Sequence, residues 1–141
     1  MADFVLVDGD QVIFLPTFGS AQVLVQPGRL RATGPMLERK RVCVEADVRD
    51  VAVAGCSYVT ATHSIPGVGT LKIDRLAPDQ TSRTKYEGWR VLLRGSQFVA
   101  RFEVQSPARS PSPASPPLPD PMRRYLGSGS FMSSNWSLRS W

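Results

Sequence analysis

The sequence predicts an all-β fold, and three observations support this. Short segments rich in Val, Ile, Leu and Phe recur along residues 4–104, and almost every gap between them holds a Gly or a Pro that favours a turn. Two segments, 41–45 and 98–104, alternate in the way that places successive side chains on opposite faces of a strand. No stretch carries an apolar stripe at helical spacing, so we expect very little helix.

Each expected strand is a β-rich run between turn residues. In 98–104, Phe98, Ala100, Phe102 and Val104 share one face and are expected to form core. Trp89 is also expected in the core, on one strand face with Val91 and Leu93. The expected strands are 4–7, 11–15, 21–25, 41–48, 51–54, 56–62, 70–76, 89–94 and 97–104.

The stretch 65–73, Ile-Pro-Gly-Val-Gly-Thr-Leu-Lys-Ile, excludes a helix. Pro66 lacks an amide donor and favours an extended Ile65, while Gly67 and Gly69 permit positive φ. We therefore predict a corner between strands at 65–69.

The composition changes after residue 105, which predicts three parts: a β domain at 1–105, a Pro-rich linker at 106–122 and a docking segment at 123–141. The prolines favour extended polyproline II geometry, so the linker is expected to act as a semi-rigid spacer. We expect a turn at 127–129 and a terminal strand at 130–140, which docks on its own domain or on a neighbouring chain. The aromatic and apolar residues expected to make partner contacts there are Phe131, Trp136, Leu138 and Trp141.

Composition limits the function classes. The chain of 141 residues has a net charge of +5, but its basic residues are spread thinly, so we expect no nucleic-acid partner. No apolar run approaches the ~18 residues that span a bilayer. The first residues lack the pattern of a secretory signal, so we expect synthesis in the cytoplasm.

Catalysis is not expected. The only histidine, His63, is separated from Cys56 by a segment expected to be a strand, so no nucleophile and base pair is apparent. The phosphate-binding loop, the dinucleotide fingerprint, the zinc-protease helix motif and the serine elbow are all missing from the sequence.

The candidates for a metal site are Cys43, Cys56 and His63. A structural zinc site needs four ligands, and these three match no common spacing. Both cysteines lie among small and apolar residues, which favours two buried, reduced thiols; zinc binding and a disulfide are the alternatives. We therefore expect no cofactor.

Several segments resemble one family. They are Gly34-Pro35, 42–45, 55–58, 65–73, Asp79-Gln80 and 91–95, and the likeness covers roughly residues 5–105 and, loosely, the terminal Gly-Ser-Gly-Ser-Phe. On these residues the chain resembles the PAAR-like spike tip proteins of bacterial contractile injection systems. Pro107-Ala108-Arg109 is not the motif that names the family, and the several histidines that usually bind apical zinc are missing here.

The resemblance implies a small, cone-shaped, β-rich protein. It would cap a trimeric, valine-glycine-repeat-like β-helical spike, one tip per trimer, and sharpen the spike so that it pierces the target envelope. Effector cargo is a further implied partner, and the target membrane would be met only during piercing. The protein would sit at the distal end of the particle and be expelled on contraction.

Two other functions stay open at this point. A small basic β-barrel that binds single-stranded nucleic acid would suit the positive charge and the aromatic residues Tyr58, Tyr86 and Trp89. A virion assembly protein with a docking arm would suit the Pro-rich linker.

Overall fold

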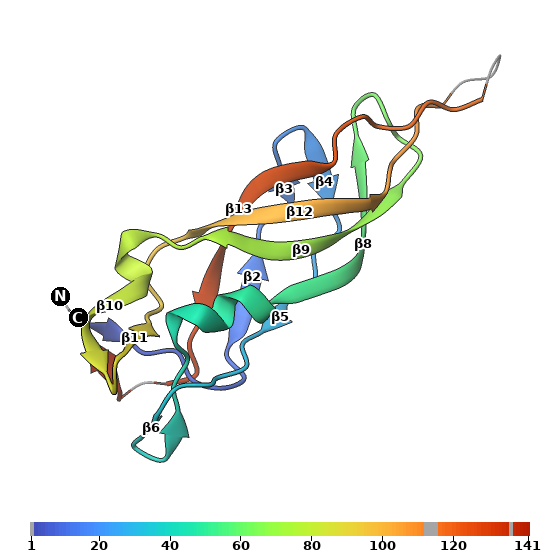
Figure 1. Cartoon of the computed structure of the whole chain (residues 1–141). Coiled ribbons are helices and arrows are strands. Elements are labelled where there is room, and N and C mark those ends of the chain that lie inside the picture. Colours follow the sequence, from blue (N-terminus) through green and yellow to red (C-terminus); the bar gives the residue numbers. More distant parts are fainter. Residues whose placement is uncertain (1, 112–115, 136) are drawn as a thin grey trace.

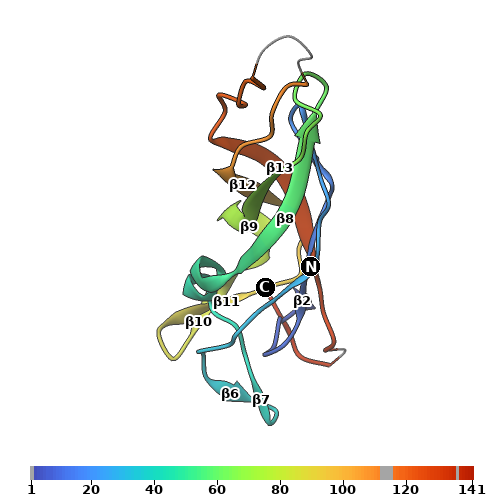
Figure 2. The same ribbon diagram turned by 90° about the vertical axis from the view of Figure 1, so that its right-hand side faces the viewer.

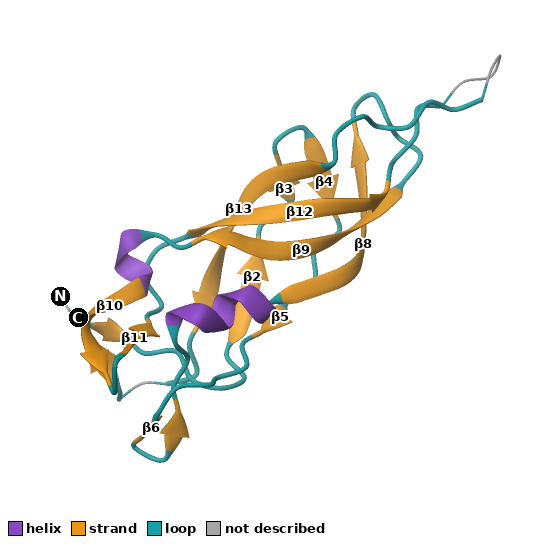
Figure 3. Cartoon of the chain, in the orientation of Figure 1, coloured by secondary structure: helices purple, strands orange, loops and turns teal. Residues whose placement is uncertain are grey.

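The computed structural model describes residues 2–111, 116–135 and 137–141. Strands and loops dominate it, and helix is limited to the short 3-10 turns η1 (Glu45–Asp50) and η2 (Pro78–Gln80), so the expected all-β class is confirmed (Figure 3). In the described part of the chain no helix is long and apolar enough to cross a membrane.

The main sheet, as far as the structure describes it, has eight strands, and all neighbours are antiparallel. The long strands β9 and β12 run along the long axis of the molecule (Figure 1). In sheet order the strands are β3 (Thr17–Phe18), β4 (Ala21–Val23), β8 (Ala52–Thr60), β9 (Gly67–Arg75), β12 (Phe98–Ser106), β13 (Arg124–Met132), β2 (Gln11–Phe14) and β5 (Gly28–Arg29).

This sheet curls back on itself. The strands β2 and β3 lie far apart in the sheet order, yet only Leu15 and Pro16 separate them in the chain. Phe18 of β3 also lies so close to β13 that a Cβ on Gly127 would be 2.7 Å from its ring. The curled sheet encloses an aromatic core made of Phe14, Phe18, Tyr58, Phe98, Phe102, Tyr125 and Phe131.

Short antiparallel pairs lie at one end of the sheet, beside both termini. They are β1 (Asp3–Phe4) with β14 (Arg139–Ser140), β6 (Met36–Leu37) with β7 (Lys40–Arg41), and β10 (Thr81–Tyr86) with β11 (Trp89–Leu92). Figure 2 shows that the molecule spreads here and narrows towards the loops at its other end. We call these the wide end and the narrow end.

The predicted corner at 65–69 is wrong, because β9 begins at Gly67 and Gly69 lies within it. Neither glycine has positive φ. Glycine is required there by close approach instead: a Cβ on Gly69 would be 2.5 Å from the ring of Phe102. The chain reverses earlier, at residues 61–66, between the antiparallel strands β8 and β9. Gly55 (φ 74) lies inside β8, at a register shift, and the expected strands 51–54 and 56–62 form this one strand.

Three further expectations need correction. The second half of the expected strand 41–48 is the turn η1, since the Asp47 carboxylate accepts the Val44 amide and holds the chain there. The expected turn at 127–129 lies inside β13, where missing side chains leave room for aromatic rings. Trp89 is 53% exposed, although Val91 on the same strand is buried.

The segment after the prolines docks on its own domain, the first of its two expected destinations. The single strand expected at 130–140 is wrong, because β13 ends at Met132 and β14 spans only Arg139–Ser140. Strand β13 lies between β12 and β2, inside the main sheet. The described parts of the expected spacer form a loop whose two sides are hydrogen-bonded to each other. Ser110 N donates to Leu118 O (2.9 Å) and Asp120 N donates to Ala108 O (2.7 Å). It returns the chain to the sheet, because β13 must pair directly with β12.

Candidate functional site

Three stretches with similar sequences meet at the wide end. Residues 4–10 read Phe-Val-Leu-Val-Asp-Gly-Asp, 41–47 read Arg-Val-Cys-Val-Glu-Ala-Asp, and 90–96 read Arg-Val-Leu-Leu-Arg-Gly-Ser. Each stretch continues a strand of one outer pair, namely β1, β7 and β11. We call each stretch with its outer pair an arm, numbered first, second and third along the chain.

A closed ring of backbone hydrogen bonds joins the three arms. Leu6 N donates to Leu92 O, Leu92 N donates to Cys43 O, and Cys43 N donates to Leu6 O, each at 2.9 Å. The β-bridges Val5–Leu93, Val7–Val42 and Val44–Val91 surround this ring. Because equivalent residues of each arm donate to the next arm and accept from the other, the backbone has pseudo-threefold symmetry.

Side chains on the two faces of the ring belong to different clusters, as strand alternation requires. The central residues Leu6, Cys43 and Leu92 have no exposed surface and join the core of the main sheet. Their neighbours in the chain face the opposite way and form a second cluster. Its buried members are Val5, Val7, Val42, Val91 and Leu93, and the half-buried Leu37, Tyr86 and Leu138 pack on them, each from a different arm.

Pairing in the outer strands follows the same symmetry. The first residue of each stretch pairs across its outer strands: Phe4 pairs with Arg139, Arg41 with Met36 and Arg90 with Lys85. Within the described residues, β14, β6 and β10 each pair along one side only in the sheets. Outside the sheets, the Arg83 amide of β10 also donates to Trp141 O, next to β14, so the outer strands of the first and third arms contact each other.

Buried polar side chains complete the first two arms. Asp10 Oδ2 accepts the Val7 amide and Asp47 Oδ2 accepts the Val44 amide, both at 2.8 Å. The third arm has Ser96 at this position, and the Leu93 amide donates to Gln80 O instead. The equivalence of the arms thus lies mainly in the backbone.

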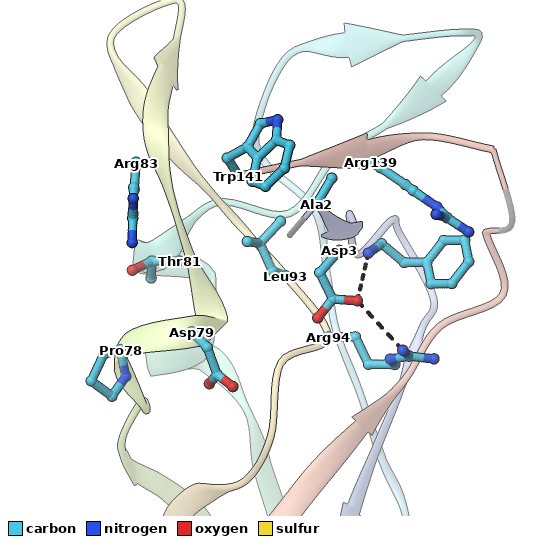
Figure 4. Close-up of a pocket in the computed structure, with 11 residues that line it drawn as sticks. Ala2, Asp3, Pro78, Asp79, Thr81, Arg83, Leu93, Arg94, Arg139 and Trp141 are labelled. Carbon is cyan, nitrogen blue, oxygen red and sulfur yellow. Dashed lines mark hydrogen bonds and ion pairs between the residues drawn. The ribbon is translucent and has the colours of Figure 1, made fainter.

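A groove lies between the first and third arms, as Figure 4 shows. Its volume is about 750 Å³. Asp3 accepts from the Phe4 amide (2.7 Å) and pairs with Arg94 (3.5 Å). The groove is lined by Ala2, Asp3, Phe4, Pro78, Asp79, Thr81, Arg83, Leu93, Arg94, Arg139 and Trp141.

The narrow end is closed by a buried carboxylate. Asp120 Oδ2 accepts from the hydroxyls of Tyr58 (2.9 Å) and Tyr125 (2.6 Å), and Tyr58 Oη accepts from the Ala108 amide (2.9 Å). These contacts bind the two described sides of the Pro-rich loop, at Ala108 and Asp120, to β8 and β13. We call Tyr58, Asp120 and Tyr125 the clamp.

The clamp groups have shifted pKa values. Burial disfavours the charged carboxylate, yet hydrogen bonds from Tyr125, the Met122 amide and Tyr58 together hold the pKa of Asp120 below its usual value. Burial and then the Asp120 carboxylate raise the pKa of Tyr58 to about 12, and the same causes raise the pKa of Tyr125. The clamp is therefore an ionised carboxylate between two neutral phenols at neutral pH.

The structure does not bring the metal candidates together. Cys43 lies in the ring, Cys56 lies in β8, and His63 follows β8 with its Nδ1 2.9 Å from Thr62 Oγ1. Among the residues that the structure describes, no group of three or more His, Cys, Asp or Glu side chains is placed to hold a metal ion. The absence of a cofactor stays a prediction.

The expectation of two buried, unbridged thiols is confirmed. Burial, with the carboxylates of Asp47, Asp10 and Asp8 adding to it, raises the pKa of Cys43 far above its ordinary value. Burial also raises the pKa of Cys56, against a backbone hydrogen bond from Gln26. Both thiols are consequently protonated and unreactive at neutral pH.

The residues predicted to contact a partner have different environments. Phe131 is 4% exposed and packs on Phe98 (5.1 Å between ring centres), so its place in a partner site is corrected to a place in the core. Leu138 is half-buried at the wide end and Trp141 is exposed in the groove; their contacts with a partner stay a prediction. Trp136 lies outside the described residues.

Sequence reasoning missed the ring. Its only trace in the sequence is a weak repeat, found at 4–10, 41–47 and 90–96. Each copy has an aromatic or basic residue, then Val, then two apolar residues, and a small residue at the sixth position. Its spacing is irregular, so a search for a fixed repeat length does not find it. Only the hydrogen bonds show that the three stretches are equivalent.

Comparison with known proteins identifies the family. A family model of contractile injection system spike tip proteins matches residues 1–140. No curated protein matches the chain. This match spans nearly the whole chain. The family that it identifies, and the β-rich, tapering form of the structure, both agree with the resemblance noted in the sequence. The chain therefore belongs to the contractile injection system spike tip proteins, a structural family found with the spike at the distal end of the injection particle.

Proposed function

We propose that this spike tip caps a trimeric β-helical spike, with one copy seated on three spike chains through the wide end. The observation that carries this proposal is the ring of hydrogen bonds through Leu6, Cys43 and Leu92. A single chain has no symmetry of its own, so seating it on a threefold shaft requires three similar contacts. The pseudo-threefold backbone supplies them.

The contact itself would use the outer strands of the arms. Strands β14, β6 and β10 are short, and each pairs along one side only within the sheets of the described residues. An extended segment of each spike chain would add to one of them by backbone hydrogen bonds, which tolerate different side chains in the three arms. This accounts for arms that share a backbone but differ in sequence.

The narrow end would then lead during contraction and pierce the target envelope. The long strands β9 and β12 run from the wide end towards it, and the clamp fastens the loop at its end. Force along this axis would be shared by many ladder hydrogen bonds, since β12 pairs with both β9 and β13. The proposed role is mechanical and involves no catalysis, and any effector cargo would be an additional load.

Reconstitution tests the seating. The purified chain is mixed with the trimeric spike of the same particle, and the mass of the complex is measured by light scattering after gel filtration. The expected result is one tip per spike trimer. A stable complex with three tips, or none at all, would refute the cap.

A further inference from the structure

The three arms differ in how they use their arginines. In the second arm Arg41 Nη1 donates to Gly34 O (2.9 Å), and in the third arm Arg90 Nη1 donates to Ser82 O (3.0 Å). Each of these guanidinium groups is bound to a backbone carbonyl in its own arm or just before it. In the first arm the equivalent residue is Phe4, whose ring has no such bond to make.

Phe4 instead supports two arginines beside the groove. The guanidinium carbon of Arg139 lies 4.4 Å from the centre of its ring, and that of Arg94 lies 5.2 Å from it. A cation held over an aromatic face keeps its N–H groups free at the edge. Arg94 also forms an ion pair, in which its Nη2 lies 3.5 Å from Asp3 Oδ1.

Two of the three arginines that line the groove have no ion pair, since among the described residues no carboxylate lies within ion-pair distance of Arg83 or Arg139. Of the two acidic residues in the lining, Asp3 accepts from the Phe4 and Gly95 amides and Asp79 accepts from the Ser96 hydroxyl. The guanidinium groups of Arg83 and Arg139 are therefore available to carboxylates from outside the chain.

Apolar lining favours a protein partner over a nucleic-acid backbone. Leu93 is buried in the lining, and Trp141 in the lining is 60% exposed. Exposed Trp beside Arg is typical of the residues that dominate protein–protein binding. The groove also lies at the wide end, next to the proposed seat.

We propose that this groove binds an acidic segment of one spike subunit, with Arg83 and Arg139 contacting its carboxylates and Trp141 packing on its apolar part. The inference rests on the proposed function. A second groove lies at the equivalent position between the second and third arms, but different residues line it, among them Glu45, Lys85 and Trp89. Because the two linings differ, only one of three identical spike subunits would be bound through Arg83, Arg139 and Trp141, and this contact would fix the rotational setting of the tip on the shaft.

Binding of variants to the immobilised spike trimer tests this inference. The variant Arg83→Ala/Arg139→Ala is expected to bind about tenfold more weakly or worse, and with a smaller salt dependence. The matched control, Arg123→Ala/Arg124→Ala, removes the same charge from two exposed residues, the last before β13 and the first within it, and is expected to bind like the unchanged chain. Circular dichroism and a thermal melt check that each variant is folded, and Arg83→Glu serves as a second, single-site variant.

The outcomes separate the two proposals. If the unchanged chain does not bind the trimer, the proposed function fails. If it binds and the groove variants bind equally well, only the groove inference fails. Equal losses in the groove variant and the control, or loss of retention on single-stranded oligo(dT) without loss of spike binding, would also overturn the groove inference.

Discussion

The main sheet and the wide end are stabilised in different ways. In the sheet, long strands satisfy one another's backbone groups and aromatic rings fill the core, as where Phe102 packs on Tyr58 (5.2 Å) and Phe18 (6.1 Å). At the wide end the strands are short, the cluster is made mainly of valines, and buried polar side chains complete the hydrogen bonds. One example is Asn135, whose Nδ2 donates to Val5 O (3.0 Å) and to Leu138 O (2.6 Å).

This difference separates stability from recognition. Large buried rings contribute most to the free energy of folding, because the hydrophobic gain grows with apolar area removed from water. Small valines contribute less per residue but allow three backbones to approach closely enough for the ring through Leu6, Cys43 and Leu92. The sheet is therefore expected to provide most of the stability, and the wide end to provide a defined shape.

The largest expected effect comes from the aromatic core. Phe102→Ala should lower the free energy of unfolding by about 3–5 kcal/mol, because a fully buried ring is replaced by a cavity. The matched change at the wide end, Val91→Ala, should cost about 2 kcal/mol, since it removes two buried methyl groups. Urea denaturation measures both. Equal losses would contradict the assigned difference between the two regions.

The clamp should give the next largest effect. Asp120→Asn is expected to lower the free energy of unfolding by about 2–3 kcal/mol, because charged hydrogen bonds from two tyrosines are weakened. Tyr58→Phe should lose much of the same energy, so the double variant should cost less than the sum of the two changes. Additive losses would show that the clamp residues act separately.

The clamp also predicts a dependence of stability on pH. The pKa of Asp120 is lower in the folded state, so its contribution is present above the unfolded value of about 3.9 and is lost as the pH falls below it. The pKa of Tyr58 is raised to about 12, so stability should also fall as the pH rises from about 10 to 12. Melting temperatures across pH measure both limits. Asp120→Asn should lack the acid loss; an acid loss of the same size there would assign it to other carboxylates.

A smaller effect is expected from the polar groups of the arms. Asp10→Ala should cost about 1–2 kcal/mol, because the buried Val7 amide and the Ser134 amide lose their acceptor. Ser96→Ala, at the equivalent position of the third arm, should cost less than about 0.5 kcal/mol because Ser96 is exposed. Chemical denaturation of the pair tests this. If Ser96→Ala cost more free energy of unfolding than Asp10→Ala, the third arm would not differ from the first at this polar position.

The smallest effect on stability is expected from exposed apolar residues. Trp89→Ser at the wide end and Leu118→Ser at the narrow end should each change the free energy of unfolding by less than about 0.5 kcal/mol. On the proposed seating, only Trp89→Ser should weaken binding to the spike trimer. Weaker binding from Leu118→Ser alone would place the contact at the narrow end.

Local patterns predicted much of the sheet. The alternation from Phe98 to Phe102 and the strand at 11–15 are confirmed, because a two-residue period directly specifies which side chains are buried. The errors fall where close packing decides. Gly67, Gly127 and Gly129 suggest turns in the sequence, but inside β9 and β13 they leave room for neighbouring atoms. Trp89 follows the apolar pattern of its strand and is still exposed, since the strand extends beyond the cluster.

The sequence by itself determined the all-β class, most strand positions and the resemblance to spike tips, because these follow from alternation, turn residues and local motifs. Only the tertiary structure decided that β13 enters the main sheet, that Asp120 joins Tyr58 and Tyr125, and that three distant stretches form a ring. The physical reason is that these features depend on backbone hydrogen bonds and contacts between residues far apart in the chain. Such pairings are chosen by the packing of the whole molecule, and a local pattern such as the weak repeat of the three stretches does not specify which of them pair.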